Sequence, residues 1–104
     1  MPTNASLPLP VTQALRKLGQ DLAVARRKRG ISTSDMASRL FVSRDTLWRM
    51  ESGDPTVSVG TLATAAFVLQ LHDRLGSLAA PEKDTLGLAL DEQRLRKRIR
   101  RVRA

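Results

Sequence analysis

The chain has 104 residues, of which 41% are hydrophobic and 3% aromatic, and its formal net charge is +8. This length fits one small domain with a short extension. The absence of cysteine excludes disulfides and cysteine-ligated zinc. No apolar run approaches a membrane span and the start lacks the features of a signal peptide, so we expect a soluble, cytoplasmic protein without a membrane partner.

The first ten residues contain Pro2, Pro8 and Pro10, and we expect residues 1–10 to be a flexible or extended lead-in. After them, apolar residues recur at helical spacing and predict a helix over about 12–29. Its apolar stripe consists of Leu15, Leu18, Leu22 and Ala25. Gly30 is expected to end this helix, because glycine favours the left-handed conformation of a helix stop.

Two short helices are predicted within residues 31–53, ISTSDMASRLFVSRDTLWRMESG. Ser32 can cap the first helix, and Asp35 stands three residues later, as in a capping box. Ser43 can cap the second helix in the same way. Gly53 supplies the left-handed stop. This is the layout of a helix-turn-helix DNA reader.

The spacing between these two helices also favours that layout. Only Phe41 and Val42 lie between them, so the helices must cross sharply, and the small Ala37 suits the point of contact. Leu47 and Met50 give the second helix an apolar face that can be buried.

Two more helices are predicted downstream. Asp54 and Pro55 form a turn, after which Ser58 can cap a helix that carries Leu62, Ala65, Ala66 and Leu69. A fifth helix is expected over about 72–79 and is ended by Pro81. Further on, Leu86, Leu88 and Leu90 alternate with smaller residues, which indicates a short strand. Because the rest is helical, this strand would pair with a second subunit, and we expect a homodimer.

Nearly all of the net charge lies at the end of the chain. Residues 94–104 carry seven basic and no acidic side chains, whereas residues 1–93 carry 11 basic and 10 acidic ones. Such a run is usually a solvated, disordered arm. Leu95, Ile99 and Val102, with Asp91 as a cap, instead favour a basic amphipathic helix that binds phosphates or an acidic groove. A membrane surface is a weaker third interpretation.

The face of the second motif helix opposite its apolar side presents Arg44, Asp45, Trp48 and Arg49, with Thr46 at the flank. Arginine can pair with guanine through two hydrogen bonds, and aspartate can accept one from cytosine. The alternative is a solvated face on which Asp45 and Arg49 form an ion pair worth about 0.3 kcal/mol. The whole set favours DNA.

The segment from about Leu18 to Leu78 resembles the Xre family of bacterial regulators, which includes the lambdoid phage repressors. The resemblance implies that Thr33 touches phosphate, that Arg44, Asp45 and Arg49 reach bases, and that Arg26 and Glu51 form a buried pair. The turn position usually held by glycine is Phe41 here, so we expect a turn of a different shape. The expected DNA-binding residues, with the loop before the fourth helix included, are Thr33, Ser43, Arg44, Asp45, Thr46, Arg49, Thr56 and Ser58. For Thr56 and Ser58 the commoner alternative is that they are plain turn and cap residues.

An enzyme is not expected, since the single histidine, His72, has no cysteine or second histidine to complete a nucleophile or metal site. No cofactor or metal is expected. The stretch TLWRMESGDPTVSVGTL, the alanine-rich fourth helix and the basic tail resemble HipB-type antitoxins. That resemblance implies a repressor that autoregulates its operon as a dimer and holds a HipA-like kinase toxin.

Three functions remain open: an antitoxin that also reads DNA, a stand-alone Xre-type regulator without a toxin, and a nonspecific nucleic-acid binder driven by the tail. The expected fold is all-α, a lambda-repressor-like five-helix bundle. The lead-in spans 1–10, the DNA-binding domain 11–80, and the extension 81–104, with its dimer strand and basic tail.

Overall fold

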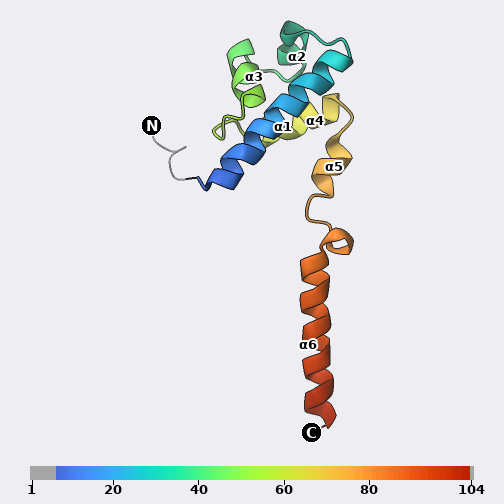
Figure 1. Ribbon diagram of the computed structural model, residues 1–104. Helices are drawn as coiled ribbons and strands as arrows, with labels where there is room; N and C mark the ends of the chain where they lie inside the picture. The colour runs from blue at the N-terminus through green and yellow to red at the C-terminus, as the bar shows by residue number, and fades with distance from the viewer. Residues whose placement is uncertain (1–6, 104) are drawn as a thin grey trace. The chain divides into compact units, whose positions relative to one another are not determined.

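The computed structural model describes residues 7–103, with side chains up to Arg101. These residues form six α-helices and one short 3-10 helix, and no strand occurs among them (Figure 1). The helices are α1 (Leu9–Lys28), α2 (Thr33–Arg39), α3 (Arg44–Glu51), α4 (Val59–Val68), α5 (His72–Gly76), η2 (Pro81–Lys83) and α6 (Thr85–Arg103). The expected all-α class is confirmed, with one more helix than predicted. The chain divides into two compact units, of which the first ends at His72 and the second begins at Asp73.

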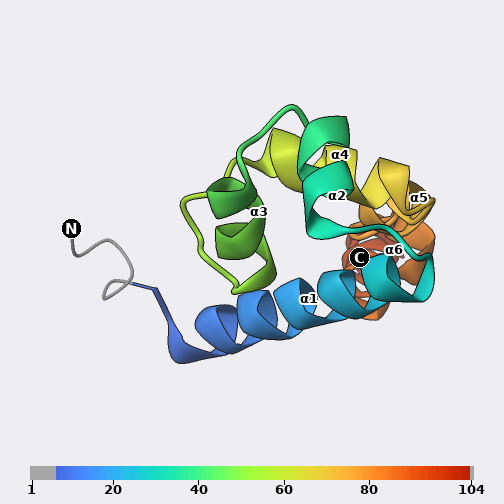
Figure 2. The same ribbon diagram turned by 90° about the horizontal axis from the view of Figure 1, so that it is seen from above.

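The first unit is built around α1. This helix begins at Leu9, three residues earlier than predicted, because Pro8 and Pro10 suit the first turn of a helix. The predicted lead-in therefore ends earlier than residue 10, and residues 1–6 lie outside the described part. Figure 2 shows α1 along one side of the unit, with α2, α3 and α4 on its other side. The largest fully buried side chains between them are Met36, Leu47 and Leu69.

The contact between α1 and α3 depends on a glycine that the apolar pattern does not reveal. Leu22 is buried as predicted, but Leu18 is 40% exposed. The buried position is its neighbour Gly19, where an added Cβ would lie 2.6 Å from the carbonyl oxygen of Glu51. The end of α3 can approach α1 so closely only because Gly19 has no side chain.

The turn between α2 and α3 keeps the left-handed form, so the prediction of a different shape was wrong. Phe41 has a φ of +55°, and its side chain is 94% exposed. The Phe41 N–H donates to the Ser38 carbonyl over 3.1 Å, and the Val42 N–H donates to the Ala37 carbonyl over 3.0 Å. These two hydrogen bonds close a Schellman motif, and they offset the roughly 1–2 kcal/mol that a left-handed conformation costs a bulky residue.

The second unit contains a helix where a strand was predicted. Leu86, Leu88 and Leu90 all lie in α6, whose start is capped by Asp84 through a 2.9 Å hydrogen bond from the Gly87 N–H. Leucine and alanine favour helix, and residues 86–93 include no β-branched residue that would favour a strand. Asp91 is therefore an interior residue of α6 and not its cap.

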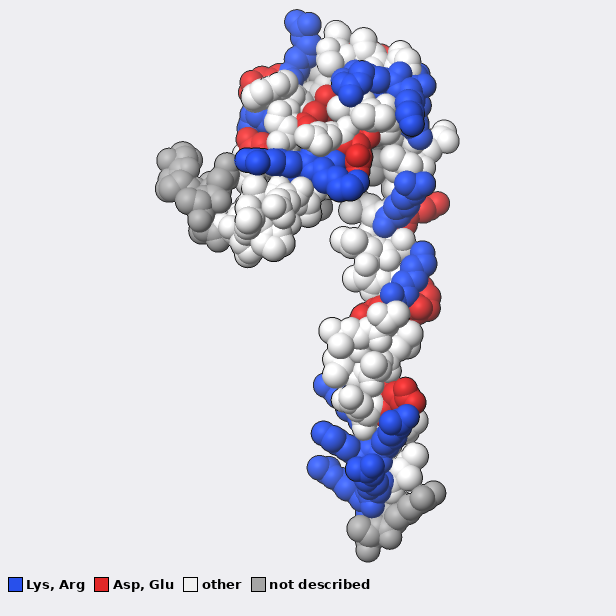
Figure 3. All heavy atoms as spheres, in the orientation of Figure 1, with Lys and Arg blue, Asp and Glu red and all other residues white. Residues whose placement is uncertain are grey.

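The basic tail is helical, as the amphipathic interpretation predicted. Residues 94–103 form the second half of α6, and the basic side chains of residues 94–101 gather there in Figure 3. The interpretation as a disordered arm is thus wrong for these residues.

Candidate nucleic-acid interface

Serine caps define the start of both motif helices. Ser32 Oγ accepts a hydrogen bond from the Asp35 N–H over 3.0 Å, and Ser43 Oγ accepts one from the Thr46 N–H over 3.1 Å. Both caps were predicted. Between the helices, Ala37 is 3% exposed, which confirms that a small residue occupies the region where they pack.

The orientation of α3 follows from its buried face. Leu47 and Met50 are 1% and 5% exposed and belong to the core, as the sequence predicted. Consequently Arg44, Asp45 and Trp48 point outwards and are exposed. These side chains form the outer face of α3, the surface that a recognition helix turns towards base edges.

A buried ion pair fixes the end of α3 against α1. Arg26 Nε donates to Glu51 Oε2 over 2.8 Å and Nη2 donates to Glu51 Oε1 over 3.2 Å. Arg26 Nη1 donates to the Ile31 carbonyl over 2.9 Å, and the residue is only 6% exposed. The pair that the family resemblance implied is therefore present. The hydrogen bonds of Arg26 join α1 to the end of α3 and to Ile31, and because Arg26 is buried and paired with Glu51, it contributes no charge to a binding surface.

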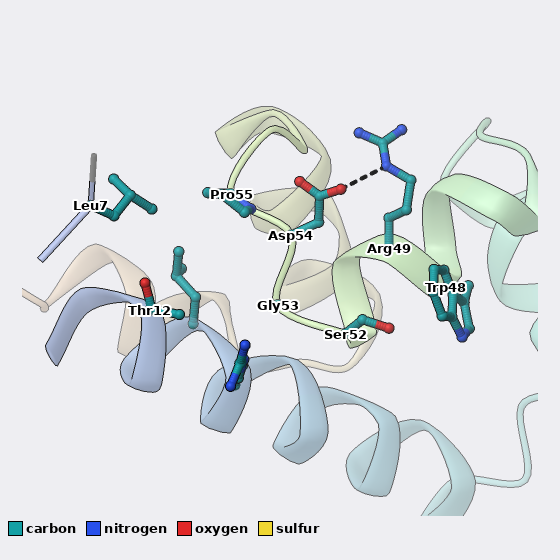
Figure 4. Close-up of a pocket in the computed structure, with 10 residues that line it drawn as sticks. Leu7, Thr12, Trp48, Arg49, Ser52, Gly53, Asp54 and Pro55 are labelled. Atoms are coloured by element: carbon teal, nitrogen blue, oxygen red, sulfur yellow. Dashed lines mark hydrogen bonds and ion pairs between the residues drawn. The ribbon is translucent and has the colours of Figure 1, made fainter. Parts of the chain in front are cut away.

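Arg49 is held by the loop that follows α3. Its Nε donates to Asp54 Oδ2 over 2.9 Å, as Figure 4 shows, and its Nη2 donates to Thr56 Oγ1 over 2.6 Å. Thr56 donates its own hydroxyl to Asp54 Oδ1 over 2.6 Å and its backbone N–H to the same oxygen over 2.8 Å. Asp54, and not Asp45, is thus the carboxylate that receives the Arg49 Nε–H.

This network occupies one edge of the guanidinium group. Nε and Nη2 share that edge, and an arginine carries five N–H donors in total. No hydrogen bond from Nη1 is formed within the described part of the chain. The end of the Arg49 fork, made by Nη1 and the second Nη2 hydrogen, therefore has no hydrogen-bond partner within the described residues.

The network also fixes the charge states of its members. Hydrogen bonds from Thr56 and then from Arg49 lower the pKa of Asp54 to about 2. The hydrogen bond to Asp54, followed by the charge of Asp54, raises the pKa of Arg49 above its ordinary value. Both groups remain ionised at any physiological pH, so the orientation of Arg49 does not depend on pH there.

The other predicted site residues are distributed over three helix starts. Thr33 is exposed at the start of α2, and Thr46 is half-buried in α3. The hydroxyl of Ser43 donates to Thr46 Oγ1 over 3.1 Å, and that of Ser58 donates to Thr61 Oγ1 over 2.9 Å. Ser58 also caps α4 by accepting from the Thr61 N–H. The structure brings only Arg49 and Thr56 of the predicted set into a shared network beyond these caps.

Sequence reasoning assigned Asp54 to a turn and missed its contact with Arg49. The available signal was an aspartate at a turn, because such a carboxylate commonly accepts a hydrogen bond from the backbone N–H two residues later, here that of Thr56; this pattern does not indicate the contact with Arg49. Beside the pair lies a hollow of about 280 Å³ (Figure 4). Its lining includes Trp48, Arg49, Ser52, Asp54 and Pro55.

A family model described as "Helix-turn-helix domain" matches residues 17–76, which is more than half of the chain. The chain belongs to the helix-turn-helix domain family. The match runs from the middle of α1 to the end of α5, so α6 lies outside it. Members of this family bind DNA and typically have no enzymatic activity. Comparisons with curated proteins and with solved structures give no significant match.

Two further observations concern the described residues. None of the helices is both long enough and apolar enough to cross a membrane. No group of three or more histidine, cysteine, aspartate or glutamate side chains is arranged there to hold a metal ion.

Proposed function

We propose that this protein is a sequence-specific transcriptional repressor that reads operator DNA with the outer face of α3. The observation that carries the proposal is the braced Arg49, whose Nε and Nη2 donors are held by Asp54 and Thr56. A guanine offers N7 and O6 to two parallel N–H donors. The end of the Arg49 fork presents such a pair in an orientation that is set before DNA arrives, which reduces the ordering cost of binding.

Arg44 and Asp45 supply the neighbouring contacts in this proposal. Both are exposed in the first turn of α3, the part of a recognition helix that meets base edges. Arg44 would pair with a second guanine and Asp45 would accept from cytosine N4. Thr33 would contact phosphate at the start of α2, and Ser43, Thr46, Thr56 and Ser58 would line the backbone on either side of the groove.

The proposed repressor acts as a homodimer. One recognition helix makes few base contacts, whereas two related by a two-fold axis read half-sites about one DNA turn apart. Its proposed biological role is that of an antitoxin which autoregulates its operon and binds a HipA-like kinase. Support for this role comes from the resemblance to HipB-type antitoxins within α3, the following loop and α4. A stand-alone Xre-type regulator is the alternative, and a kinase-like gene beside this one, with capture of its product, separates the two.

The DNA proposal is tested by selection from a pool of random duplexes with the purified protein. The expected result is enrichment of a motif with two-fold symmetry. Selection with Arg49→Ala should lose the preference at one base pair of each half-site. Selection with the control variant Lys17→Ala, which removes an exposed charge from α1, should enrich the same motif as the wild type. A pool without any enriched motif would overturn sequence-specific reading and favour a nonspecific binder.

A further inference from the structure

The helix α6 carries an apolar stripe along one side. Leu88, Leu95 and Ile99 are spaced seven and four residues apart, so they lie on one face of the helix. They are 50%, 57% and 44% exposed. Leu86 and Leu90 lie on the opposite face, so the side chains do not form a single broad patch.

The stripe has the spacing of a coiled-coil seam. Placing Leu88 and Leu95 at d positions puts Glu92 and Ile99 at a positions, over two successive heptads. Glu92 is the one charged residue in this seam, and its carboxylate is drawn to the edge by a 2.8 Å ion pair with Arg96. An exposed seam of this kind is stabilised when a second helix covers it.

The charges of the second unit are separated along the chain. Residues 81–93 contain Glu82, Asp84, Asp91 and Glu92 but only one basic residue, Lys83. Residues 94–101 contain six basic residues and no acidic one. Two copies side by side in parallel would therefore place the basic halves together and would set Glu92 against Glu92. Two antiparallel copies would place residues 94–101 of each helix beside residues 86–93 of the other, which include Asp91 and Glu92 and no basic residue.

We propose that α6 is the dimer contact and that it pairs antiparallel with α6 of a second copy. In this register Leu88 faces Ile99 of the second copy, and Glu92 faces Leu95 and not another carboxylate. Asp91 and Arg98 both take g positions, which meet each other across an antiparallel pair. The seam thus acquires an ion pair at each of its two ends. The inference rests on the proposed homodimer and adds its helix, orientation and register.

The pairing is tested first by mass in solution. The wild-type chain should be a dimer by sedimentation at about 100 µM, a concentration chosen because two heptads make a short seam. Leu95→Asp should shift it to monomer. Leu90→Asp is the matched control, since it places the same charge on the opposite face and should leave the dimer intact. Circular dichroism of all three proteins reports whether α6 remains helical.

Orientation is tested by disulfide formation, which the cysteine-free chain permits without background. Leu88 and Ile99 are 11 residues apart, or about 16 Å along a helix, so their cysteines can meet only in the antiparallel register. A mixture of Leu88→Cys and Ile99→Cys proteins should cross-link about tenfold faster than either variant alone. Faster linkage of each variant to itself would show a parallel pair and overturn the orientation.

Two other outcomes would overturn the contact itself. A wild-type monomer at this concentration would show that α6 does not pair with a second copy. Dissociation by Leu90→Asp but not by Leu95→Asp would place the contact on the other face. Neither outcome bears on base reading by α3, which the duplex selection measures separately.

Discussion

Arg49 in α3 and Asp54 in the following loop form an ion pair of 2.9 Å that joins the outer face of α3 to the loop before α4. The side chains of the pair are only 35% and 26% exposed. Because Thr56 closes the network from the loop, the three side chains are joined by hydrogen bonds to one another. The orientation of Arg49 is therefore a property of the loop as well as of the helix.

The first prediction concerns the role of Asp54 in base reading. Asp54→Ala releases Arg49, so binding to the selected operator should weaken by about 1 kcal/mol while binding to random duplexes changes little. Asp54→Asn retains an oxygen for the Thr56 N–H and should recover part of the preference. Asp21→Ala, which opens an exposed ion pair on α1, is the control. Equal losses on operator and random DNA would show that Asp54 only supports the loop.

The second prediction follows from the low pKa of Asp54, about 2 in the folded protein. An aspartate in an unfolded chain titrates near 3.9, so the unfolded state binds the proton first as pH falls. The stabilisation from this carboxylate is complete above about pH 4 and is lost as pH falls through about 2. The free energies of unfolding of the wild type and of Asp54→Asn, measured with urea, should converge over that range. If the two proteins differ in free energy of unfolding by the same amount at pH 5 and at pH 2, the low pKa of Asp54 is contradicted.

The third prediction concerns the close approach of α1 and α3. Gly19→Ala places a Cβ 2.6 Å from the Glu51 carbonyl oxygen and should lower the free energy of unfolding by about 1–3 kcal/mol. Gly60→Ala is the matched control, since its Cβ meets nothing nearer than 3.8 Å and alanine favours the helix. Thermal or urea unfolding of both variants measures the difference. Similar free energies of unfolding for the two variants would mean that α1 and α3 can move apart at no cost in stability.

The fourth prediction concerns the basic half of α6. Arg94, Lys97 and Arg101 lie on the face opposite the apolar seam, so changing all three to glutamine should preserve the proposed dimer. If they track phosphates, the slope of log affinity against log salt should become shallower by about 0.9 for each phosphate that the variant no longer neutralises. Operator and random DNA should weaken by similar factors. An unchanged slope would assign these charges to a protein partner or to solubility.

Much of the first unit could be predicted because its signals are local. Ser32, Ser43 and Gly53 each act within one helical turn, so the sequence alone places the helix ends. The Arg26–Glu51 pair spans 25 residues and was found only through the family resemblance. Asp54 was missed because an aspartate that only forms a turn and one that also accepts a hydrogen bond from Arg49 have the same neighbours in the sequence.

The error at α6 has a different cause. Leu86, Leu88 and Leu90 alternate as in a strand, but Leu88 also continues the helical spacing of Leu95 and Ile99. Over five residues the two periods cannot be distinguished. The cap at Asp84 and the helix-favouring leucines decide the outcome, and both are visible only when the longer segment is considered. The turn at Phe41 was predicted wrongly because the size of the ring was expected to prevent a left-handed conformation. The ring is exposed, so only the strain of the backbone has to be offset.

The most direct test of base reading by Arg49 measures four affinities: wild type and Arg49→Ala, each on the selected operator and on a duplex changed at the single base pair assigned to Arg49. The wild type should prefer the operator by about 1–3 kcal/mol, and Arg49→Ala should bind both duplexes about equally. If Arg49→Ala keeps the full preference, then Arg49 does not read that base pair, and the central claim is wrong.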